Sequence, residues 1–186
     1  MRLPGDDLIG HPDVVTTHAV TVDAPPATVW PWLVQMGWHR GGWYTSRWVD
    51  RLLFPANAPS ATRIVPELQH LEVGDFVPDG PPKTECGLHV MAIDPGRSLV
   101  LRSTSHLPKR WRDSGVARLD WSWAFVLLPV DGVSRTRFVF RSRWVTQPWW
   151  LTAAGLVLVV PADFVMSRAM LRGVRTRAEG WRTEVR

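Results

Sequence analysis

Large apolar residues alternate with polar or small residues along two stretches of the chain, 119–127 and 138–144. A period of two places every second side chain on the same face, which predicts β-strands. Asp131-Gly132 lies between the two stretches and is typical of a hairpin turn. A second pair of β-rich runs, within 87–103, flanks the turn sequence at 94–97. One face of these hairpins is aromatic and the other is polar, which predicts an antiparallel sheet covered on one side.

Two short helices are predicted between the first strand and the rest of the sheet. The first strand, residues 17–23, precedes a helix over 24–36 whose first turn holds two prolines, which suit that position. Pro31 removes a backbone donor from this helix, so we expect it to bend or to start late. Residues 46–53 form the second short helix, before a loop.

A long helix is predicted at the C-terminal end, over residues 161–181, with Pro161 in its first turn. Its apolar residues recur at helical spacing, and they are Ala162, Val165, Met166, Ala169, Met170, Gly173 and Val174. Arg175 is placed to pair with Glu179 one turn later. This stripe predicts the helix that covers the aromatic face of the sheet.

The order of elements is a strand, two helices, a meander of antiparallel strands and a long helix, which predicts an α+β fold with helices on one face of a curved sheet. The length of 186 residues fits one domain. We expect residues 1–16 to be an irregular lead-in and residues 17–182 to be that domain.

Tryptophan dominates the aromatic residues, with 12 Trp against 1 Tyr and 6 Phe. Such an excess indicates a large aromatic interior or a cavity lined by it. The single cysteine, Cys86, excludes an intramolecular disulfide and a cysteine metal cluster. The first residues lack the apolar core of a secretory signal, and the longest apolar run, 151–160, is shorter than the roughly 20 residues of a membrane-spanning helix. We therefore expect a soluble, cytoplasmic protein without a transmembrane span.

Six segments carry a resemblance to a known superfamily. They are "VTVDAPPATVWPWLVQMG", "RGGWYTSRWVD", "RIVPELQHLEVGD", "AIDPGRSLVLRS", "WAFVLLPVDGVSRTRF" and "PADFVMSRAMLRGVRTRAE", and together they cover residues 17 to about 180. In this order they resemble the START/polyketide-cyclase-like superfamily, also called SRPBCC, and within it a bacterial branch of unassigned function. The resemblance implies the helix-grip fold, in which a curved antiparallel sheet wraps the long C-terminal helix and leaves an apolar cavity. Members bind lipids, sterols, polyketides or hormones, and some cyclise or dehydrate polyketides.

Aromatic and methionine side chains on the predicted inner faces are the candidates for a cavity wall. Part of the Trp-rich stretch 30–44 lies in a Gly-rich connection, where large rings cap a cavity as readily as they fill a core. The rings of the sheet and the methionines have the same two interpretations, packed core or adaptable lining. The predicted ligand-binding set is Trp38, Trp43, Tyr44, Trp48, Met91, Trp121, Trp123, Phe138, Phe140, Met166 and Met170.

Sequence motifs of established enzyme classes are missing. There is no GxSxG elbow, no HExxH and no glycine-rich phosphate loop, so no metal or cofactor is expected. If the cavity is an active site, Tyr44, Arg63 and His89 are the candidates to polarise a carbonyl or to shuttle protons. Two of them have structural alternatives: His89 as a satisfied histidine on a strand, and Arg63 as the partner of Glu67 in its loop.

Three functions remain open from the sequence. One is binding of an apolar small molecule between the sheet and the last helix, and another is a polyketide cyclase, aromatase or dehydratase. The third is an interaction or peripheral-membrane module, because the net charge is +5 and an arginine row at 135–143 follows the polar face of the sheet. The segment 149–160 begins with paired tryptophans and is either a buried helix or an interfacial contact. The lack of RRM, KH and helix-turn-helix signatures argues against a nucleic-acid partner.

Overall fold

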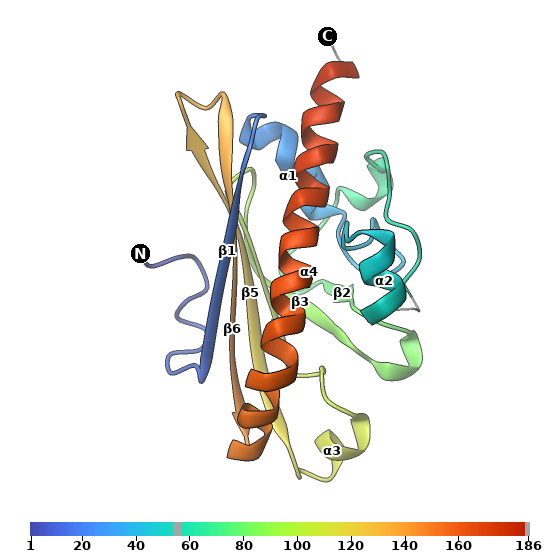
Figure 1. The fold of residues 1–186 in the computed structure, drawn as a ribbon, viewed down its shortest axis with the longest axis vertical. Coiled ribbons are helices and arrows are strands. Elements are labelled where there is room, and N and C mark those ends of the chain that lie inside the picture. The colour runs from blue at the N-terminus through green and yellow to red at the C-terminus, as the bar shows by residue number, and fades with distance from the viewer. Residues whose placement is uncertain (54–56, 185–186) are drawn as a thin grey trace.

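The computed structural model describes residues 1–53 and 57–184, in which six antiparallel strands form one sheet in the order β1-β6-β5-β4-β3-β2 (Figure 1). The strands are β1 (Val14–Val22), β2 (Phe76–Pro78), β3 (Gly87–Asp94), β4 (Ser98–Ser103), β5 (Arg118–Val130) and β6 (Arg135–Gln147). The helices are α1 (Pro26–Val34), α2 (Arg47–Leu53), α3 (Lys109–Asp113) and α4 (Trp149–Glu184), with single 3₁₀ turns at Pro66–Leu68 and Pro82–Thr84.

Helices cover one face of the curved sheet. Figure 1 views the sheet edge-on, with α1, α2 and α4 on one side and the N-terminal segment on the other. The core lies between the sheet and the second half of α4, where Phe125, Phe138 and Phe140 of the sheet and Met170 and Val174 of the helix are all buried in one cluster. The predicted α+β helix-grip fold is therefore confirmed.

Both predicted hairpins are confirmed. β5 and β6 pair along their whole length, so that Phe125 lies opposite Phe140. The turn between them places Asp131 and Gly132 at φ angles of 50° and 63°. Asp and Gly tolerate this left-handed region better than other residues, which is why the pair marks a turn. β3 and β4 form the second hairpin, around the turn at 95–97.

The start of the last helix is predicted incorrectly. α4 begins at Trp149, twelve residues before the predicted start, and Pro161 lies inside it. Proline cannot donate the helical hydrogen bond to the carbonyl four residues earlier, which belongs to Val157. Both residues are exposed, so water can satisfy that carbonyl. The predicted pair in the second half of the helix is confirmed, because Arg175 Nε donates to Glu179 Oε1 over 2.9 Å.

The N-terminal segment packs across the outer face of the sheet, and β1 begins at Val14, inside the expected lead-in. Leu3 is buried against the small apolar cluster that β4, β5 and β6 present on that face. Asp6 forms ion pairs with Arg141 at 2.7 Å and Arg143 at 3.5 Å. The expectation of a sheet covered on one side is therefore wrong over this patch, and two arginines of the row at 135–143 are paired and half-buried.

Candidate functional site

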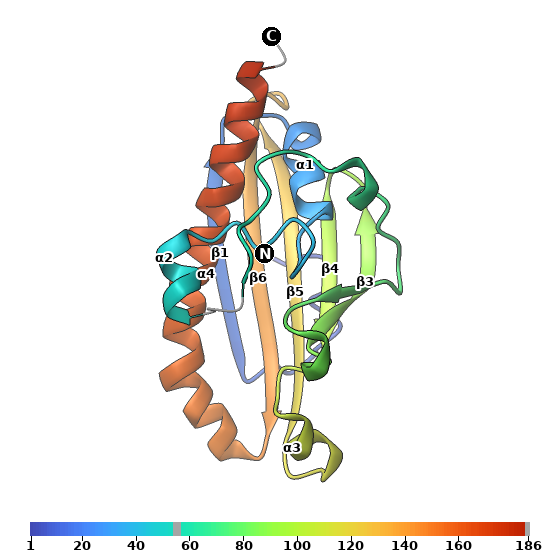
Figure 2. The same ribbon diagram turned by 90° about the vertical axis from the view of Figure 1, so that its right-hand side faces the viewer.

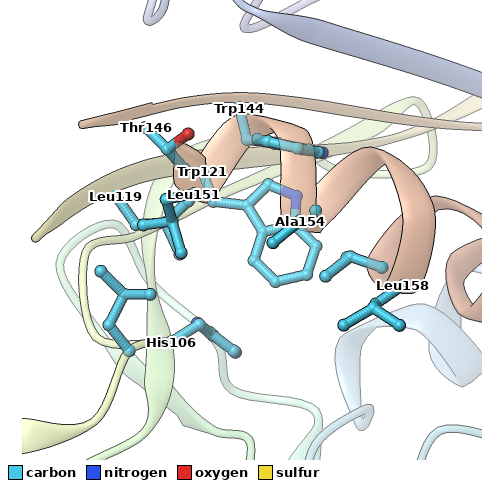
Figure 3. Close-up of a pocket in the computed structure, with 11 residues that line it drawn as sticks. His106, Leu119, Trp121, Trp144, Thr146, Leu151, Ala154 and Leu158 are labelled. Atoms are coloured by element: carbon cyan, nitrogen blue, oxygen red, sulfur yellow. The ribbon is translucent and has the colours of Figure 1, made fainter. Parts of the chain in front are cut away.

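A cavity of about 220 Å³ opens between the sheet and the first half of α4, at the end of the molecule where the helix begins (Figure 3). It is lined by Leu119 and Trp121 of β5, Trp144 and Thr146 of β6, Leu151, Ala154, Gly155, Leu158 and Val159 of α4, and His106 and Leu107 between β4 and α3. Apolar atoms make up nearly all of its wall.

Alternation along the strands and helical spacing along α4 bring these residues together. Trp121 and Trp144 are register partners on β5 and β6, so their indoles lie on the face that α4 covers. The helix approaches closely at Gly155, where an added Cβ would meet the Trp144 ring at 2.6 Å. Ala154, beside it, has a side chain too short to fill the remaining space, which leaves the cavity open.

His106 provides the polar edge of the cavity. Its Nε2 lies 2.9 Å from Asp79 Oδ2, and its Nδ1 lies 2.7 Å from Ser103 Oγ. The imidazole ring is packed edge-on against Trp121, with 5.0 Å between ring centroids. Burial by itself would lower the pKa of His106, but the neighbouring Asp79 carboxylate and Cys86 side chain raise it from 6.5 to about 9.

The hydrogen-bond network around the ring also requires the protonated form. The Ser105 hydroxyl donates to the Gly87 carbonyl over 2.9 Å, so Ser105 Oγ has to accept the Ser103 hydroxyl proton over 3.0 Å. Ser103 Oγ then has to accept from Nδ1 of His106, while Nε2 donates to Asp79. Both ring N–H groups are therefore taken up by protein acceptors, and the rest of the cavity wall is almost wholly apolar.

The structure separates the predicted ligand-binding residues into three groups. Trp121 lines the cavity. Packed in the core are Trp43, Tyr44, Trp123, Phe138, Phe140 and Met170, and the indoles of Trp43 and Trp123 touch with centroids 5.4 Å apart. Trp48 and Met91 are exposed, whereas Trp38 and Met166 are half-buried outside the cavity wall. The middle of the sheet is thus filled by rings, and the cavity lies at its end.

None of the three catalytic candidates is found among the described residues that line the cavity. Gln35 Nε2 links two of them, because it donates to the Tyr44 hydroxyl and to the Arg63 carbonyl. The Tyr44 hydroxyl is buried, donates to the Trp32 carbonyl over 3.0 Å and accepts from Gln35 Nε2 over 2.9 Å. Burial raises the pKa of Tyr44 well above its ordinary value of 10.0. Arg63 is exposed, and His89 lies exposed on β3 beside Phe76.

Sequence reasoning missed the contribution of α4 and of His106. Leu151, Ala154, Gly155 and Leu158 recur at the spacing of one helical face, so a signal was present in the apolar run. His106 and Asp79 lie in irregular segments 27 residues apart and carried no such signal. Among residues 1–53 and 57–184, no three His, Cys, Asp or Glu side chains are grouped so that they could hold a metal ion.

The curved sheet and long C-terminal helix define a helix-grip fold, and solved structures share this arrangement. No family model and no curated protein sequence matches the chain. A hypothetical protein from Helicobacter pylori, 14% identical, superposes with a TM-score of 0.54 over 96% of this chain and 95% of that one. The comparison therefore shows that the two chains share a fold.

Two structures with named functions superpose less closely. The di-domain ARO/CYC protein BexL of the BE-7585A biosynthetic pathway is 14% identical, with a TM-score of 0.49 over 89% of this chain and 46% of that one. A norcoclaurine synthase point mutant from Thalictrum is 13% identical, with a TM-score of 0.46 over 87% and 93% of the two chains.

Proposed function

We propose that the protein binds a compact apolar molecule, or one end of a longer one, in the cavity between β5, β6 and the first half of α4. The observation that carries the proposal is an open cavity of about 220 Å³ with an almost wholly apolar wall. Water in such a space finds few hydrogen-bond partners, so an apolar molecule gains free energy by displacing it.

The size of the cavity limits the ligand. An apolar cavity of about 150 Å³ is large enough for benzene, so this one suits a small fused ring system or part of an acyl chain. Thr146 is the one uncharged polar side chain in the wall, and His106 is already satisfied by Asp79 and Ser103. Selectivity therefore depends on shape more than on polar contacts.

Binding is better supported than cyclisation of a polyketide. A cyclase needs donors or bases directed at the substrate. The described residues that line this cavity do not include the candidates for that role, Tyr44, Arg63 and His89. His106 does reach the wall, but both of its N–H groups are engaged, so it is better suited to holding the wall in place.

Filling the cavity tests the proposal. Ala153 and Ala154 are both exposed, but only Ala154 belongs to the cavity wall, so Ala154→Trp and Ala153→Trp form a matched pair. We expect 2-naphthol or decanol to bind the wild type and Ala153→Trp equally in isothermal titration, and to bind Ala154→Trp at least about tenfold more weakly. Equal binding by the two variants, or no binding of either probe to the wild type, would refute this site.

A further inference from the structure

The outward side of the first half of α4 is apolar and exposed to solvent. We call the residues Trp149, Leu156, Val157, Leu158, Phe164 and Val165 the apolar α4 face. Trp149, Val157 and Leu158 have 79%, 71% and 69% of their surface exposed. No charged residue occurs between Trp149 and Ala162 in the sequence. A continuous apolar surface of this kind marks a contact with a protein or a membrane.

The two halves of α4 differ in what they contact. In the second half, Met170, Leu171, Val174 and Ala178 are buried in the core. The apolar α4 face lies outside that cluster, so its side chains add little to the packing of the domain. By length and composition, α4 over Trp149–Trp181 is apolar enough to cross a membrane, and 11% of its most apolar window is buried. The alternative of a buried segment before Pro161 is therefore excluded.

Basic residues and further tryptophans border the apolar α4 face. α3 lies at the same end of the molecule as the start of α4 in both views (Figures 1 and 2), and the rings of Trp111 and Trp150 are 5.9 Å apart. This short helix carries Arg110 together with Lys109 and Arg112, both of which also lie within ion-pair distance of Glu85. Indole rings beside arginines and lysines are suited to the boundary between lipid chains and anionic headgroups.

A second basic border lies farther along the helix. α2 packs beside α4 and presents Trp48 with 62% of its surface exposed, next to Arg47 and Arg51, which are also exposed. Arg168 lies over the Phe164 ring, 5.1 Å from its centroid, and ends the apolar α4 face. The apolar surface is thus bounded by cations at both ends.

We propose that the apolar α4 face lies in the interface of an anionic lipid bilayer, with the basic residues of α2 and α3 at the headgroups. Although α4 is long and apolar enough to cross a membrane, it lies on the membrane here, because buried residues from Ser167 onward hold its second half in the core. Asp163 is also bound, by the Thr16 hydroxyl over 2.9 Å. Pairing with a second copy is disfavoured, because the same cations, on chains of net charge +5, would face one another.

Docking in this position would also place the cavity at the bilayer. Leu158 and Val159 belong to the cavity wall and are exposed on α4, so an apolar molecule could pass from lipid to cavity without crossing water. The passage of a molecule from lipid to cavity rests on the proposed function, whereas docking of the protein on the bilayer does not.

Vesicle sedimentation tests the docking. We expect the full chain to sediment with vesicles of phosphatidylcholine and phosphatidylserine, and less with phosphatidylcholine alone or in high salt. Val157→Glu places a charge on the apolar α4 face outside the cavity wall, and we expect it to weaken binding at least about tenfold. The control is Val133→Glu, an exposed valine in the β5–β6 turn at the opposite end of the molecule (Figure 1), which should bind as the wild type does.

Two outcomes would overturn the docking proposal. One is a wild-type chain that stays in the supernatant with anionic vesicles, and the other is equal sedimentation of Val157→Glu and Val133→Glu. A dimer in analytical ultracentrifugation that Val157→Glu dissolves, without vesicle binding, would assign the face to a second copy instead. Because Val157 lies outside the cavity wall, Val157→Glu should still bind 2-naphthol, which separates failure of docking from failure of the cavity.

Discussion

Replacement of His106 by glutamine should abolish a component of stability that depends on pH. His106 is a buried imidazolium that donates to Asp79 and Ser103, and its pKa rises from 6.5 to about 9. A histidine whose folded pKa is raised stabilises the fold fully below pH 6.5, and this stability is lost as pH rises toward about 9. That difference in pKa corresponds to about 3 kcal/mol of unfolding free energy.

Urea unfolding between pH 5.5 and pH 9.5 measures this component. The wild type should lose about 3 kcal/mol more than His106→Gln over that interval, because glutamine does not titrate there. His70 is exposed, so His70→Gln serves as a control whose pH dependence should follow that of the wild type. If the unfolding free energy of His106→Gln varied with pH in parallel with that of the wild type, both the protonated form of His106 and its assigned hydrogen bonds would be refuted.

Two further predictions concern the packing of α4 on Tyr44. Tyr44→Phe removes the hydroxyl that donates to the buried Trp32 carbonyl and leaves Gln35 Nε2 with the Arg63 carbonyl as its acceptor, so urea unfolding should show a loss of about 1–3 kcal/mol. Unchanged stability would contradict the assigned hydrogen bonds. A Cβ on Gly173 would collide with the Tyr44 backbone, so Gly173→Ala should destabilise by about 1–3 kcal/mol. A Cβ on Gly180 meets nothing within 4 Å, so Gly180→Ala should instead stabilise the protein by up to about 1 kcal/mol. If both variants shifted the melting temperature in the same direction, the close contact between Gly173 and the Tyr44 backbone would be contradicted.

The sheet could be predicted because its signals are local. Alternation between 119 and 127 requires no knowledge of the partner strand, and Asp131-Gly132 defines the turn within two residues. Strands β5 and β6 were therefore placed correctly, as was the helical stripe from Met166 to Val174. The same patterns could not tell a ring in the core from a ring in a cavity wall, because Trp121 and Trp123 lie on one face of one strand.

What was missed depends on contacts between distant segments. Pro161 is a signal for a helix start, and the sequence does not show that the preceding turns are exposed enough to tolerate it. His106 pairs with Asp79 because the segment after β4 lies beside the segment after β2 in the folded chain. No local sequence pattern predicts that contact. The position of the cavity follows from Ala154 and Gly155 meeting Trp144, a coincidence of side-chain sizes in the folded chain.

The pairing of β1 with β6 has a consequence for biosynthesis. In the sheet β1 has β6 as its neighbour, and Val22 pairs with Thr136, which the ribosome adds about 110 residues later. At roughly 5–20 residues per second, the first strand waits for several seconds or longer without its partner. During translation its apolar residues are therefore available to chaperones, and the sheet can close after β6 has left the exit tunnel.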